Sequence, residues 1–93
     1  MILMTTYRLK PFMSHDERRE LVALFAEHGT PGRDIGHYIA ADNSYGVVIS
    51  ELDDPAEGYR NILNYTEHIE YETKVMLTID DAMALIGEAI SQE

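Results

Sequence analysis

Hydrophobic positions along the chain follow two different periods. Four stretches are rich in β-forming residues, and the last of them, "IEYETKVML", alternates between two faces, one of which carries its charged residues, as half-buried strands do. Three other stretches carry apolar residues at the spacing of a helix's buried stripe. The predicted strands are residues 2–9, 35–41, 45–52 and 69–77, and the predicted helices begin near residues 14, 54 and 78.

Capping signals mark where the predicted helices begin and end. "SHDE" (14–17) is a capping box, in which Ser14 caps the first helix and Glu17 occupies its third position. Gly29 is placed to end this helix in a left-handed conformation. Asp54 and Pro55 begin the second helix as its cap and its first residue. The buried stripes are expected at Leu21, Leu24, Phe25 and His28, at Tyr59, Ile62 and Leu63, and at Ala82, Leu85, Ile86 and Ala89.

The element order β-α-β-β-α-β-α is that of a ferredoxin-like α+β fold, βαββαβ, with one additional C-terminal helix. Right-handed crossovers then give a four-stranded antiparallel sheet in the strand order 4-1-3-2, with the helices on one face. We expect a single domain over residues 1–93, because this length is enough for one core.

The first and last strands are expected to be antiparallel neighbours, so matching like faces predicts their register. One layer pairs Leu9 with Ile69, Tyr7 with Tyr71, Thr5 with Thr73 and Leu3 with Val75. The other layer pairs Arg8 with Glu70, Thr6 with Glu72, Met4 with Lys74 and Ile2 with Met76. The first layer is expected to face the helices, because its ends are aliphatic and cross-strand pairs of this kind stabilise a sheet.

The second layer would form the open face of the sheet, and it changes from charged to apolar along its length. Arg8 can compensate the carboxylates at the charged end, whereas the apolar end with Ile2, Met4 and Met76 is too hydrophobic to stay exposed. We therefore expect a homodimer through the open sheet face, since self-association about a two-fold axis is the commonest solution.

Composition adds mainly exclusions. The chain is 45% hydrophobic and 26% charged, as is ordinary for a globular domain, and it has no cysteine. Its net charge of −10 opposes binding to nucleic acid and to anionic membranes. It contains no apolar run long enough to span a bilayer and no cleavable leader pattern, so a cytoplasmic location is expected.

Three stretches of the chain resemble domain-of-unknown-function family 3303, within the dimeric α+β barrel superfamily. They are "MTTYRL", "DNSYGVVISELDDP" and "YTEHIEYETKVMLTIDDA". The chain differs from the family pattern at Tyr65 and Val75, where tryptophan and proline are usual. The resemblance implies a ferredoxin-like fold and a dimer but no reaction, because no chemistry is assigned to the family.

Candidate chemistry is sparse in the sequence. His68, Glu70 and Glu72 would share one strand face, but a single strand rarely supplies three converging metal ligands, so no metal and no cofactor is expected. "GTPGRD" lacks the lysine of a phosphate-binding loop and is interpreted as a turn. The pairs of acidic residues at the predicted helix starts interact favourably with the helix dipole, so they are interpreted as structural. Catalytic residues stay unknown.

The hydroxyl-bearing residues of the helix-facing layer are the best candidates for a site. In a purely structural interpretation, the tyrosine rings pack in the core and each hydroxyl donates to a backbone carbonyl. In the alternative, functional interpretation, these residues line a small-ligand pocket between the sheet and the helices. The family resemblance implies the same location, because related barrels hold their ligands there. The predicted ligand-binding residues are Thr5, Tyr7, His37, Tyr71 and Thr73.

Three functions therefore stay open. The favoured one is a homodimer that binds a small apolar or aromatic ligand. The alternatives are a cofactor-independent enzyme, such as an oxygenase or isomerase that uses a tyrosine or histidine for proton transfer, and a non-catalytic interaction protein without a pocket.

Overall fold

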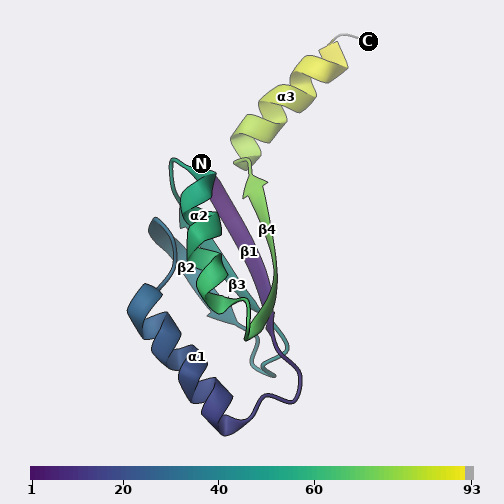
Figure 1. Cartoon of the computed structure of the whole chain (residues 1–93). Helices are drawn as coiled ribbons and strands as arrows, with labels where there is room; N and C mark the ends of the chain where they lie inside the picture. The colour runs from purple at the N-terminus through teal and green to yellow at the C-terminus, as the bar shows by residue number, and fades with distance from the viewer. Residues whose placement is uncertain (92–93) are drawn as a thin grey trace.

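A computed structural model describes residues 1–91 and shows an antiparallel four-stranded sheet with three α-helices, in the order β-α-β-β-α-β-α (Figure 1). Residues 92–93, which the predicted domain includes, lie outside the described residues. The elements are β1 (Ile2–Leu9), α1 (His15–His28), β2 (Arg33–Ile39), β3 (Gly46–Glu51), α2 (Pro55–Ile62), a short 3-10 turn η1 (Leu63–Tyr65), β4 (Ile69–Met76) and α3 (Ile79–Ser91). The ferredoxin-like α+β fold predicted from the sequence is confirmed.

The strands lie in the order β2-β3-β1-β4, which is the predicted sheet written from its other edge. All eight predicted pairs between β1 and β4 are present, from Ile2 opposite Met76 to Leu9 opposite Ile69. The pairing of β2 with β3 is interrupted by an irregularity between Asp34 and Gly36. The register therefore divides the sheet into the two predicted layers.

The N-terminal caps of α1 and α2 form as predicted, whereas the C-terminal cap of α1 does not. The Ser14 hydroxyl accepts a hydrogen bond from the Glu17 backbone N–H at 3.1 Å, and the Glu17 carboxylate accepts one from the Ser14 N–H at 3.3 Å. The hydrogen bond from the Ser14 backbone N–H, together with the nearby Lys10 ammonium group, lowers the pKa of the Glu17 carboxyl group. Gly29 ends α1 at φ +60°, but its ψ of −148° lies outside the left-handed helical region. Asp54 caps α2 by accepting from the Ala56 N–H at 3.0 Å.

The buried core lies under α2. Leu3 of β1 is 4% exposed and Leu52, which follows β3, is 5% exposed. Gly58 of α2 sits directly above them, because a Cβ placed there would lie 3.0 Å from the Leu3 side chain and 3.6 Å from that of Leu52. The absence of a side chain at this position lets α2 approach the sheet closely.

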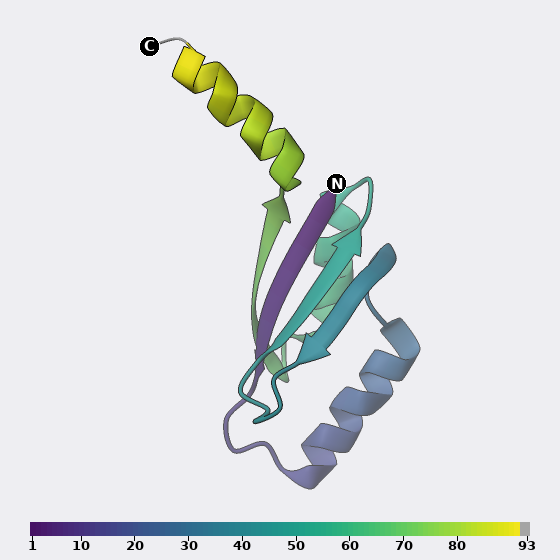
Figure 2. The same cartoon turned by 180° about the vertical axis from the view of Figure 1, so that it is seen from behind.

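Helix α1 packs much less closely than predicted. It has no buried residue, and the Phe25 ring, which was predicted to lie in the core, is 44% exposed. Figures 1 and 2 show α1 displaced toward the β2 edge of the sheet rather than centred over it. The prediction of a buried α1 stripe is wrong for this reason, and a cavity takes the place of the missing contacts.

Helix α3 does not cover the sheet either. It continues from the end of β4 and projects away from the rest of the chain (Figure 1). The radius of gyration is accordingly 16.4 Å, against about 12 Å for a compact domain of this length. The predicted stripe of α3 is therefore largely exposed, and the expectation that all helices lie on one face of the sheet is wrong for α3.

The second face of the sheet is not covered by any helix within residues 1–91 (Figure 2). We call it the open face. Its side chains come from alternate positions of all four strands, and those of β1, β3 and β4 are Ile2, Met4, Thr6, Arg8, Val47, Ile49, Glu51, Glu70, Glu72, Lys74 and Met76. Tyr38 of β2 lies opposite Val47 on the same face. Within the described residues, no helix has the length and apolar character needed to cross a membrane.

Candidate functional site

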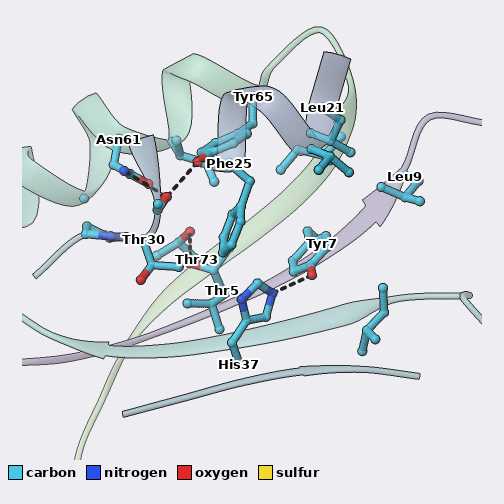
Figure 3. A pocket seen from close by; sticks show the side chains of 18 of the residues that line it. Thr5, Tyr7, Leu9, Leu21, Phe25, Thr30, His37, Asn61, Tyr65 and Thr73 are labelled. Atoms are coloured by element: carbon cyan, nitrogen blue, oxygen red, sulfur yellow. Dashed lines mark hydrogen bonds between the residues drawn. The ribbon is translucent and has the colours of Figure 1, made fainter. Parts of the chain in front are cut away.

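A partly open cavity of about 590 Å³ lies between the helix-facing layer of the sheet and helices α1 and α2 (Figure 3). All four strands contribute to its floor. Most of its wall is aliphatic or aromatic, and the residues that carry the argument below are Tyr7, Arg18, Leu21, Phe25, His37 and Tyr65. The cavity occupies the space that a closely packed α1 would fill.

Strand pairing explains why the polar residues of the floor meet. Thr5 and Tyr7 are two positions apart on β1, so their side chains leave the same face of the sheet. Thr73 lies directly opposite Thr5 on β4. The Oγ1 atoms of Thr5 and Thr73 are 2.8 Å apart and share a hydrogen bond. These two hydroxyls therefore satisfy each other within an otherwise apolar part of the cavity.

Tyr7 and His37 form the principal polar pair of the cavity. The Tyr7 hydroxyl lies 2.7 Å from the Nε2 atom of His37, and the two rings meet edge to face at 5.7 Å and 74°. The Phe25 ring also meets the imidazole edge to face, with centroids 5.4 Å apart. Burial raises the pKa of the Tyr7 hydroxyl. Tyr7 therefore stays a neutral phenol at physiological pH and can donate its hydrogen bond.

Gly46 makes the Tyr7–His37 pair possible. Tyr7 is on β1 and His37 is on β2, so the Tyr7 ring must cross the intervening strand β3 to reach the imidazole. It crosses at Gly46, its direct cross-strand partner. A Cβ at Gly46 would overlap the Tyr7 hydroxyl and would lie 2.6 Å from ring atom Cε1. The lack of a side chain at this position therefore sets the course of the tyrosine ring.

Hydrogen bonds from the α2–η1 segment hold the roof of the cavity in place. The Tyr65 hydroxyl donates to the Gly29 carbonyl oxygen at the end of α1, at 2.7 Å. The Asn61 side-chain amide lies 3.3 Å from the same oxygen and 3.3 Å from the His28 carbonyl oxygen. Because α1 has few other contacts with the sheet, these bonds fix its C-terminal end and the width of the cavity.

Changing Tyr65 to Phe is expected to destabilise the fold by about 1–3 kcal/mol, because the Gly29 carbonyl loses its best partner while the ring still fills its buried site. Chemical denaturation of the purified protein measures the change. Tyr59→Phe is the matched control, since Tyr59 lies on α2 but is exposed. Equal stabilities for the two variants would show that Tyr65 does not anchor α1.

The structure brings four of the five predicted ligand-binding residues to the cavity: Thr5, Tyr7, His37 and Thr73. Tyr71 is not among the lining residues, although it lies opposite Tyr7 as predicted; it is 37% exposed and borders a separate depression with Arg8, Glu70 and Glu72. The sequence interpretation missed the roles of Gly46 and Tyr65, and it did not include Arg18 in the lining. Gly46 was the most detectable of these, because a glycine inside a predicted strand indicates a close approach.

His68 does not share the polar strand face with Glu70 and Glu72. It precedes β4, is 4% exposed, and its Nε2 lies 3.3 Å from the Glu20 carboxylate of α1. The alternation used to place it fails because His68 lies just outside the strand. Among residues 1–91, the His, Asp and Glu side chains form no group of three positioned to hold a metal ion.

Comparison with known proteins identifies one family. A protein-family model described as "Domain of unknown function (DUF3303)" matches residues 1–90. No curated protein matches the chain.

Proposed function

The chain belongs to the DUF3303 family, and since that family is described without an activity, we propose from the cavity itself that the protein binds a small apolar or aromatic molecule between its sheet and helices. The observation that carries this proposal is a cavity whose apolar wall surrounds one hydrogen-bonded Tyr7–His37 pair. Small-molecule sites typically combine an apolar wall with a few polar groups that orient the ligand.

The size of the cavity supports the proposal. Its volume of about 590 Å³ falls in the range of about 300–1,000 Å³ that is usual for ligand sites. The aromatic groups are also placed to contact a flat molecule. Phe25 projects from α1 toward the floor, and Tyr7 and His37 lie beneath it (Figure 3). A planar ligand could pack against these rings with edge or offset contacts.

Replacing Tyr7 with Phe tests the proposal. The variant should bind about fivefold to tenfold less ligand, because one hydrogen-bond donor is lost and His37 is left without its partner. Native mass spectrometry of protein purified under non-denaturing conditions measures the molecule that co-purifies. Tyr71→Phe is the matched control, because Tyr71 lies opposite Tyr7 in the sheet but outside the cavity lining.

The expected pattern is reduced occupancy in Tyr7→Phe and normal occupancy in Tyr71→Phe. The thermal stability of Tyr7→Phe should change little, because His37 is only partly buried and water in the open cavity can replace its lost partner. A loss of stability in Tyr7→Phe without any change in bound material would contradict the proposal, because the pair would then serve only to hold the fold together.

A cofactor-independent enzyme is the second candidate, and the Tyr7–His37 pair is the observation that favours it. In this alternative His37 takes up a proton and Tyr7 orients its imidazole. The raised pKa of Tyr7 argues against Tyr7 itself as the base, because a base must lose its proton near physiological pH. Chemical conversion of the co-purified molecule by the wild type but not by His37→Gln would favour the enzyme.

We also propose that the protein is a homodimer in which two open faces meet, as in dimeric α+β barrels. The apolar part of the open face supports this proposal. Met4 of β1 lies beside Ile49 of β3, and Ile2 lies beside Met76 of β4. These side chains are only partly buried in the single chain. A contiguous apolar surface of this kind is typical of an interface.

The exposure of α3 supports the same assembly. Its large apolar side chains are all exposed in the single chain, at Ile79, Met83, Leu85, Ile86 and Ile90. A helix of 13 residues is marginally stable in water unless its apolar face packs against something. In the proposed dimer, the second copy supplies the apolar surface against which this helix packs. The cytoplasmic location expected from the sequence stays a prediction.

A further inference from the structure

The charge of the cavity lining differs from that of the rest of the protein. The chain has 17 acidic and 7 basic residues, yet none of the described residues that line the cavity is acidic. The lining contains one permanently charged residue, Arg18 of α1, whose side chain is exposed to solvent. In a protein with a net charge of −10, the permanently charged side chain that the cavity lining carries is therefore a positive one.

Arg18 is also one of two Lys or Arg residues that have no carboxylate partner within residues 1–91; the other, Arg8, lies on the open face. Five of the seven Lys and Arg side chains lie within 4.0 Å of a carboxylate, at Lys10, Arg19, Arg33, Arg60 and Lys74. Among residues 1–91, Arg18 makes no such pair. Because the Arg18 guanidinium makes no ion pair with these carboxylates, it remains available to bind an anionic ligand.

Helix geometry directs Arg18 to the cavity. Arg18, Leu21, Val22 and Phe25 are spaced at i, i+3, i+4 and i+7, so they share one face of α1, and all four line the cavity. The next residue, Arg19, is rotated away from this face and pairs with Asp16 at 2.6 Å. The two adjacent arginines therefore have the same chemistry but different surroundings.

Building on the ligand binding proposed above, we propose that the ligand is an organic anion, with an aromatic or aliphatic body and one carboxylate group. The body lies between the α1 face and the sheet, where the lining is apolar. The carboxylate lies at the mouth beside the Arg18 guanidinium, whose planar set of donors matches a carboxylate in two parallel hydrogen bonds. The Tyr7–His37 pair contacts the body within the cavity.

A pair of matched probes tests this inference. 2-Naphthoate and 2-naphthamide have the same ring system and nearly the same shape, but only the first is an anion. Equilibrium dialysis at fixed ionic strength measures both affinities for the full chain. The matched comparison is necessary because the net negative charge of the protein opposes every anion at long range. We expect the wild type to bind the carboxylate about fivefold to tenfold more tightly than the amide.

Two variants then assign the preference to one residue. Arg18→Gln should bind both probes equally while keeping its affinity for the amide, and Arg19→Gln should keep the wild-type preference. Both side chains are exposed, so neither change should alter folding, and far-ultraviolet circular dichroism checks this. A wild type without a preference, or a preference that persists in Arg18→Gln, would overturn the inference while leaving ligand binding intact. Failure of the wild type to bind either probe, together with no co-purified molecule, would overturn both.

Discussion

Replacing Met4 with lysine should convert the proposed homodimer into a monomer. Met4 lies on the open face between Ile49 of β3 and Lys74 of β4, so the new ammonium group would enter the apolar part of the interface beside an existing positive charge. Burying an unpaired charge costs several kcal/mol, so the dissociation constant of the dimer should rise by about 100-fold or more. Sedimentation velocity at micromolar concentration measures the change.

The control for this change is Glu72→Gln, at the charged end of the same face. Glu72 is exposed and pairs with Lys74 at 3.1 Å on its own strand, and exposed pairs of this kind contribute little. We expect this variant to remain dimeric. A wild type that sediments as a monomer, or a dimer that is indifferent to Met4→Lys, would show that the open face is not the interface.

Changing Gly46 to Ala should have the largest effect on the cavity. The added methyl group would overlap the Tyr7 ring and force it away from His37. We expect ligand affinity to fall by about tenfold or more, because the hydrogen bond is broken and the ring moves into the ligand's space. Overpacking of this kind should also lower the free energy of unfolding by about 1–3 kcal/mol. Calorimetric titration and chemical denaturation measure the two effects.

A double-mutant cycle with Tyr7→Ala isolates the cause. Once the ring is removed, the methyl group of Gly46→Ala has nothing to overlap, so the second change should add almost no further loss of affinity. Additive losses would contradict the interpretation, since they would mean that Gly46 acts on the cavity by a route that does not involve Tyr7.

Local signals were enough to predict the elements and the sheet. The Ser14–Glu17 capping box and the Asp54–Pro55 start depend only on neighbouring residues, so they form wherever the fold places them. The pairing of β1 with β4 could be predicted because a shift of one residue would exchange the two faces of a strand. The observed register pairs apolar Leu3 with apolar Val75 and basic Arg8 with acidic Glu70, and a shift of one residue would lose both matches.

The candidate site was predicted only in part, for a related reason. Alternation along a strand correctly placed Thr5, Tyr7 and Thr73 on one face of the sheet. It could not show that Tyr71, on the same layer as Tyr7, lies outside the cavity. Which residues of a layer lie beneath a cavity depends on where the helices end above the sheet, and helical periodicity does not contain that information.

The position of α1 was decided only by the tertiary structure. The spacing of Leu21, Leu24 and Phe25 predicts an apolar stripe, but it does not say how closely that stripe approaches the sheet. The distance is set by bonds from residues far along the chain, chiefly the Tyr65 hydroxyl on the Gly29 carbonyl. The Tyr7–His37 contact likewise depends on a gap at Gly46, on the strand between them. Both are long-range contacts, and a pattern in the sequence describes only the face that a residue occupies, not its partner across the fold.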